Sequence, residues 1–135
     1  MKLLKILHYV ESSFEDEPSF VLLMSDNKEY ISNGCVFIEN NEDNIEHLTD
    51  KYDCKRYLDE LFASDSKEMN EITNANYMFY NSNITEFDSD MSSVTNAEYM
   101  FYDTNMTKFN SDMSNVTNVD CMFFNTPYGR SVNND

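Results

Sequence analysis

The second half of the chain repeats itself with a period of 22 residues. The segments that begin at Met69, Met91 and Met113 align without a gap, and residues 84–90 align in the same way with residues 106–112. A fixed period of this size is typical of a solenoid, in which each repeat forms one turn of a stack. One short turn cannot bury an apolar face alone, so contacts between turns must stabilise the stack.

Apolar residues recur at fixed places in the repeat, and this recurrence predicts columns of buried side chains. The predicted columns are Phe87 with Phe109, Phe79 with Phe101 and Phe123, and Tyr77 with Tyr99 and Cys121. A buried core thiol is therefore expected at Cys121 rather than a reactive one. The pair Thr95-Asn96 has equivalents in Thr73-Asn74 and Thr117-Asn118. We expect this polar pair to form hydrogen bonds with backbone groups at a bend in each repeat.

The repeat also resembles a known family. The pattern M-S-N-V-T-N-x-x-x-M-F, with an I-T-x-F segment between copies, resembles the BspA-type leucine-rich repeat over residues 69–126. It is a shorter variant, with Phe87 and Phe109 where such a strand usually carries Leu. The resemblance implies a right-handed solenoid with short parallel strands on one side. It also implies a binding module of the kind found on bacterial surfaces and in protist and phage genomes.

The first half of the chain has a different character. Short apolar runs alternate with turn-forming residues, which predicts a small antiparallel meander, and residues 42–62 show near-helical spacing with Asn41 or Asn44 as the N-cap. A solenoid needs a cap over its exposed apolar end. We expect strands near 1–10, 19–24, 29–31 and 35–38. The predicted domains are a cap over 1–62, about three repeats over 63–126 and a tail over 127–135.

The expected fold class is therefore an α/β repeat: a short leucine-rich-repeat-like solenoid with an N-terminal α+β cap. One point stays open, because Leu58-Asp59-Glu60-Leu61 is similar to Ile84-Thr85-Glu86-Phe87. The first strand of the stack could lie at either place.

Several features favour a cytoplasmic protein. No stretch approaches the ~18 apolar residues of a membrane span. The first apolar run contains His8, meets Glu11 and lacks the small-residue cleavage site of a secretory signal. The three cysteines show no C-x-x-C spacing, so neither a disulfide framework nor a zinc site is indicated.

Nothing in the sequence indicates an enzyme. The histidines are His8, in an apolar run, and His47, on an expected helix face. No nucleophile elbow, P-loop or dinucleotide fingerprint occurs. Asp88 and Asp90 recur only as Asn110 and Asp112, which suits a turn better than an acid/base pair or a calcium loop. We expect no catalytic residue, no cofactor and no metal.

Charge is the second informative feature. Twenty-five acidic residues against nine basic ones give a formal net charge of −16. Nucleic acid and anionic membranes are disfavoured as partners, because both would be repelled. A field of this sign attracts a basic protein, although solubility alone would also account for the composition. The sequence does not indicate an oligomeric state.

The surface expected to bind a partner is the strand side of the repeats. We expect a non-enzymatic protein-interaction module, most concretely an acidic inhibitor of a basic nucleic-acid-handling protein, as phage anti-CRISPR or anti-restriction proteins are. The alternative is a surface adhesin or receptor-like leucine-rich-repeat protein. The predicted partner-binding residues are Thr85, Glu86, Asp88, Asp90, Thr107, Lys108, Asn110 and Asp112.

Overall fold

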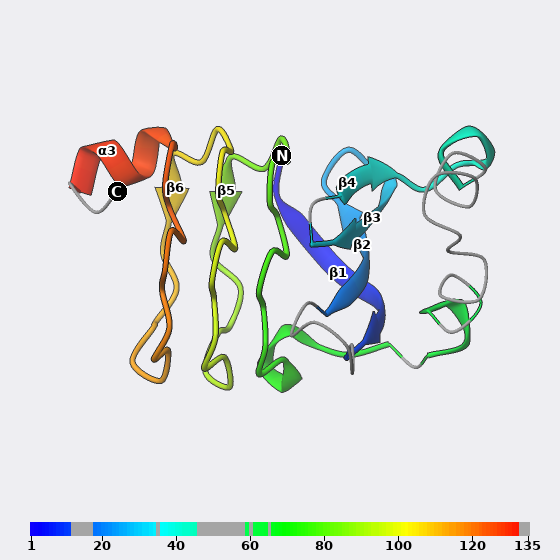
Figure 1. The fold of residues 1–135 in the computed structure, drawn as a ribbon, viewed down its shortest axis with the longest axis horizontal. Coiled ribbons are helices and arrows are strands. Elements are labelled where there is room, and N and C mark those ends of the chain that lie inside the picture. Colours follow the sequence, from blue (N-terminus) through cyan, green and yellow to red (C-terminus); the bar gives the residue numbers. More distant parts are fainter. Residues whose placement is uncertain (12–17, 35, 46–58, 60, 65, 133–135) are drawn as a thin grey trace.

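Four antiparallel strands open the chain. The structure is a computed structural model that describes residues 1–11, 18–34, 36–45, 59, 61–64 and 66–132 (Figure 1). The sheet has the order β1-β2-β3-β4, which confirms the expected meander. Its strands are β1 (Leu3–Val10), β2 (Ser19–Met24), β3 (Glu29–Asn33) and β4 (Val36–Glu39).

The central strand β2 is buried on both faces, as its continuous apolar run SFVLLM requires. Phe20, Leu22 and Met24 join the main core that continues into the repeats. Val21 points to a smaller cluster with Ile31 and Leu61 on the other face. The sheet therefore joins the repeats on one side and a helical segment on the other.

The helix expected over 42–62 is described only at its two ends, because residues 46–58 and 60 lie outside the described part of the chain. Residues 42–45 and 61–63 are helical. The Asn41 side-chain oxygen accepts a 3.0 Å hydrogen bond from the backbone N–H of Asn44. This is an N-cap interaction, and it identifies Asn41 as the cap out of the two candidates, Asn41 and Asn44.

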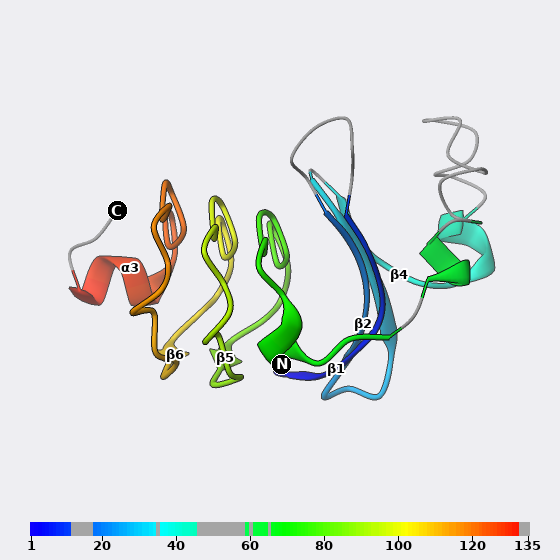
Figure 2. The same cartoon turned by 90° about the horizontal axis from the view of Figure 1, so that it is seen from below.

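The 22-residue repeats lie side by side (Figure 2), and backbone hydrogen bonds join each repeat to the next. The N–H of Ala75 donates to the carbonyl of Asn96 at 2.8 Å, and one repeat further Ala97 donates to Asn118 at 2.9 Å. Regular elements in this part are brief. They are the 3-10 helix η1 (Met69–Glu71), the parallel strands β5 (Glu86–Phe87) and β6 (Lys108–Phe109), and α3 (Pro127–Val132).

The expected fold class is wrong. The regular structure of the described residues is a four-stranded antiparallel sheet, a two-stranded parallel sheet and short helices, and not a leucine-rich-repeat-like α/β solenoid. The reason is local. Between β5 and β6 the chain is made of turns, in which Asp and Asn side chains accept hydrogen bonds from the backbone two residues on, as Asp90 does from Ser92 at 2.8 Å.

Phenylalanine rings fill the centre of the stacked repeats as predicted. Phe101 lies between Phe79 and Phe123 with ring centroids 5.5 Å away on each side, and all three rings are nearly parallel. Phe87 and Phe109 form the second column, with centroids 6.0 Å apart. Phe109 is only partly buried, since it belongs to the last repeat.

The third predicted core column is wrong. Tyr77, Tyr99 and Cys121 are half-buried at the surface, so Cys121 is not a buried core thiol. Each of the three has a positive φ, of 62°, 57° and 53° respectively. This left-handed conformation turns the side chain outward, whereas the Met-Phe pair that follows each of them points into the core.

The sheet and α3 cover opposite ends of the repeats (Figure 1). At one end the Ser32 hydroxyl donates a 2.7 Å hydrogen bond to the carbonyl of Met78. At the other end the segment expected to be a tail forms α3, where the Tyr128 ring lies 4.7 Å from that of Phe123. None of the described helices is long and apolar enough to span a membrane.

Candidate protein-binding surfaces

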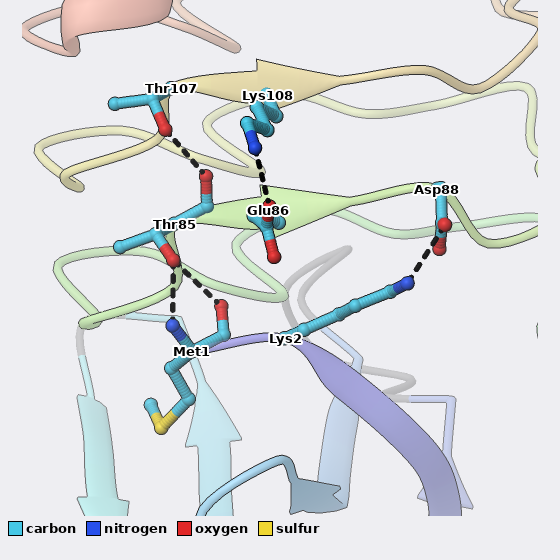
Figure 3. Close-up of polar contacts among 7 residues, drawn as sticks. All are labelled: Met1, Lys2, Thr85, Glu86, Asp88, Thr107 and Lys108. Carbon is cyan, nitrogen blue, oxygen red and sulfur yellow. Dashed lines mark hydrogen bonds and ion pairs between the residues drawn. The ribbon is translucent and has the colours of Figure 1, made fainter.

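The structure brings most of the predicted partner-binding residues together along β5 and β6 (Figure 3). Lys2 pairs with Glu86 in parallel, so the start of the chain lies beside β5 on the side opposite β6. We call this surface the strand face; it comprises Met1, Lys2, Thr85, Glu86, Asp88, Thr107, Lys108 and Asn110. Of the alternative first strand at 58–61, residues 59 and 61 are helical and residues 58 and 60 lie outside the described residues.

Two ion pairs neutralise carboxylates of the strand face. Lys2 Nζ lies 2.8 Å from Asp88 Oδ2, and Lys108 Nζ lies 3.3 Å from Glu86 Oε1. The hydrogen bond with Asp88 raises the pKa of Lys2 above its ordinary value. The sequence had indicated a mostly anionic surface, but each of these acids has a lysine next to it. The strand face consequently presents mixed charge around a hollow of about 210 Å³.

The start of the chain continues the hydrogen bonding of the repeats. The backbone N–H of Thr85 donates to the Met1 carbonyl at 2.8 Å, just as Thr107 donates to the Thr85 carbonyl at 2.9 Å. The Met1 α-amino group also donates to Thr85 Oγ1 at 2.6 Å. Thr85 therefore has a structural role in addition to the predicted binding role.

Asp90 and Asp112 lie beyond the strand face, at the turn that follows each strand. Their carboxylates accept hydrogen bonds from the backbone N–H groups of Ser92 and Ser114, at 2.8 and 2.9 Å. The hydrogen bonds from Ser92 hold the pKa of Asp90 below its ordinary value. Both residues are exposed, but their geometry is that of turn formers.

A second surface was not recognised as such in the sequence. Tyr77 stacks on Tyr99 with centroids 5.1 Å apart, and beside them Tyr80 stacks on Tyr102 at 5.1 Å and Tyr102 on Phe124 at 5.4 Å. Tilted contacts join the two columns, such as the 5.3 Å contact between Tyr99 and Tyr102. We call these five rings the aromatic ridge.

Three acidic residues are close neighbours of the aromatic ridge. Glu98 directly precedes Tyr99, Asp103 directly follows Tyr102, and the carbonyl of Asp120 accepts a 2.9 Å hydrogen bond from the backbone N–H of Tyr99. Asp103 accepts a hydrogen bond from the Asn125 side chain. No lysine or arginine of the described residues lies within ion-pairing distance of these three carboxylates. The aromatic ridge therefore carries free negative charge, unlike the strand face.

The ridge escaped prediction because its signal was ambiguous. The recurring Y-M-F-Y sequence places four apolar side chains in a row, and nothing in it shows which of them point outward. The deciding feature is the left-handed residue at 77, 99 and 121, followed four residues later by another at 81, 103 and 125. Asn81 and Asn125 were a usable hint, because asparagine tolerates this conformation.

The histidine and metal expectations concern other parts of the chain. His8 Nδ1 lies 2.9 Å from the Ser64 carbonyl, and its ring contacts Phe62 edge-on, which is a packing role. His47 lies outside the described residues. Within the described ranges, no group of three or more His, Cys, Asp or Glu side chains could hold a metal ion.

The chain matches no protein-family model, no curated protein and no solved structure. The resemblance to BspA-type repeats therefore depends on the sequence pattern alone. Any functional inference has to come from the two surfaces themselves.

Proposed function

We propose that the chain is a protein-interaction module that binds a basic protein. The observation that carries the proposal is the negative charge left without a cationic partner on the repeats. Residues 66–132 hold nine Asp and Glu side chains against two Lys and one Arg. Of these nine acidic residues, all of them described, only Glu86 and Asp88 form ion pairs. Such a surface attracts and orients a positively charged partner.

The stacked repeats suit this function because they fix side chains before a partner arrives. Backbone hydrogen bonds connect each repeat to the next, and the rings of successive repeats are nearly parallel. Outward side chains are consequently held in columns. A surface that is already ordered loses little conformational entropy on binding, so more of the interaction energy appears as affinity.

A narrower form of the proposal is an inhibitor that occupies the nucleic-acid site of its partner. Proteins that handle DNA or RNA expose basic grooves that fit phosphate charges. An acidic protein of this size could fill such a groove, as phage anti-CRISPR and anti-restriction proteins do. The charge of −16 supports this form.

Calorimetric titration with protamine, a basic protein, tests the proposal. We expect binding at low salt that weakens steeply as salt rises, because the attraction is screened over about 8 Å at physiological ionic strength. An acidic protein titrated into the chain in place of protamine is the control and should not bind the chain. Absence of protamine binding at low salt would contradict the proposal. For the narrower form, duplex DNA should compete with the chain for the same protamine.

A further inference from the structure

We infer that the aromatic ridge is the surface that contacts the basic partner, and that it selects arginine over lysine. The inference depends on the proposed function, because it locates the contact and names its chemistry. The parts of the ridge that carry it are in the second and third repeats. Backbone hydrogen bonds join Asp103 to Phe124 and Tyr99 to Asp120, and Glu98 directly precedes Tyr99.

The geometry of the ridge limits what it can bind. Within each column the rings cover one another, since Tyr102 and Phe124 are 5.4 Å apart and only 9° from parallel. The outward surface therefore consists mainly of ring edges and phenol oxygens. Phe124 ends its column and is 41% exposed, so it also offers a free ring face.

Free charge distinguishes the ridge from the strand face. Glu86 and Asp88 already have Lys108 and Lys2 as partners at 3.3 and 2.8 Å. In the described part of the chain, neither lysine nor arginine pairs with Glu98, Asp103 or Asp120. A cationic side chain from another protein gains more where no internal lysine has to be displaced.

Arginine fits this combination of groups better than lysine does. Its planar guanidinium can lie on an aromatic ring and at the same time bond a carboxylate through two N–H groups. A lysine ammonium is more strongly hydrated and makes no such planar contact. Single-stranded nucleic acid also stacks on aromatic rings, but the same three carboxylates would repel its phosphates. The open ring face that a guanidinium needs is that of Phe124 at the column end, where the backbone N–H of Asp103 donates to the Phe124 carbonyl at 3.0 Å. A neutral sugar can also lie on this face, but it gains no charge attraction from the carboxylates.

Titration with nona-arginine and nona-lysine peptides of equal charge tests the inference. The chain has no tryptophan, and four of its nine tyrosines lie in the ridge, so tyrosine fluorescence responds to a ligand bound there. We expect the arginine peptide to bind at least about fivefold more tightly, as a ring contact beyond simple charge attraction implies. Equal affinities would overturn the inference. Tighter binding of oligothymidine or of a chitin oligosaccharide than of nona-arginine would also overturn it.

Two sets of variants locate the contact. Phe124→Leu removes the ring with the free face but keeps an apolar side chain, and should reduce the preference for arginine to near one. Phe124→Tyr keeps the ring and should retain most of the preference, and a denaturant melt of each variant shows that both are folded. Glu86→Lys with Asp88→Lys changes the strand face and should leave the preference intact.

The outcomes separate this inference from the proposed function. If the strand-face variant loses binding and the ridge variant does not, a basic partner is supported and the ridge is not its site. If neither protamine nor either peptide binds at low salt, both the proposed function and this inference fail.

Discussion

The α-amino group of Met1 donates a 2.6 Å hydrogen bond to Thr85 Oγ1, a residue 84 positions away in the sequence. The backbone N–H of Thr85 donates in turn to the Met1 carbonyl at 2.8 Å. Thr85 thus joins the first residue of the chain to the strand β5 through both its main chain and its side chain.

Replacing Thr85 with Val should lower the free energy of unfolding by about 1 kcal/mol, because a partly buried hydrogen bond to a charged donor is lost while the shape is kept. Denaturant melts measure this change. Thr107→Val is the matched control: its hydroxyl is exposed and makes a longer 3.3 Å contact. The control should change stability by less than about 0.5 kcal/mol. Equal effects of the two substitutions would show that the hydrogen bond with Met1 contributes no more to the free energy of unfolding than the exposed contact of Thr107.

Phe101→Ala should cost about 3 to 5 kcal/mol in the free energy of unfolding, the usual range for a buried aromatic side chain. Phe101 is fully buried between two parallel rings, so the cavity has little room to collapse. Val132→Ala, at a site 40% exposed on α3, is the control and should have little effect. A loss below about 1 kcal/mol for Phe101→Ala in a denaturant melt would contradict the central position of this ring.

Acid should weaken the turn at Asp90. Hydrogen bonds from Ser92 lower the pKa of Asp90 from the ordinary 3.8. A carboxylate whose folded-state pKa is depressed contributes stability above its unfolded pKa and loses it as pH falls through the folded value. Asp90→Asn keeps an oxygen for the Ser92 N–H but cannot titrate. As pH falls from neutral to acid, the free energy of unfolding should therefore decrease more for the parent protein than for the variant. Melts at a series of pH values measure this difference. A difference that stays constant over this range would refute the prediction.

Alkali should destabilise the sheet through two tyrosines. Burial raises the pKa of Tyr9 to about 12 and that of Tyr30 to about 12, with the Asp26 hydrogen bond adding to the effect at Tyr30. A raised folded-state pKa contributes stability below the unfolded value of about 10, and this stability is lost as pH rises towards the folded value. Melts of Tyr9→Phe with Tyr30→Phe should show a smaller loss over this window. The tyrosinate absorbance should show less late titration in the double variant than in the parent protein.

The 22-residue period predicted which side chains of successive repeats lie next to one another. Phe79, Phe101 and Phe123 stack at one fixed offset because each repeat is the same length and its backbone bonds to the next. The four strands of the meander were predictable for a similar reason, since apolar runs and turn residues alternate clearly there.

The fold class and the ridge depended on backbone conformation that residue types specify poorly. Asp90 could begin a helix or a turn, and its hydrogen bond to Ser92 decides for the turn. Tyr99 could face inward or outward, and its φ of 57° decides for outward. The pairing of Lys2 with Glu86 has no local signal at all, because it joins segments that are distant in sequence. The charge of the strand face was overestimated for the same reason.

The pairing of Lys2 with Glu86 also sets an order of events during synthesis. The segment around Lys2 is made before residues 85–88 and cannot complete its contacts until they have emerged, since Lys2 also bonds Asp88. Until then the core residues Leu3 and Ile6 lack their contacts with the repeats, and a large loop has still to be closed. Contacts of such long range slow folding, so closure of this junction should limit the rate at which a newly made chain reaches its final state.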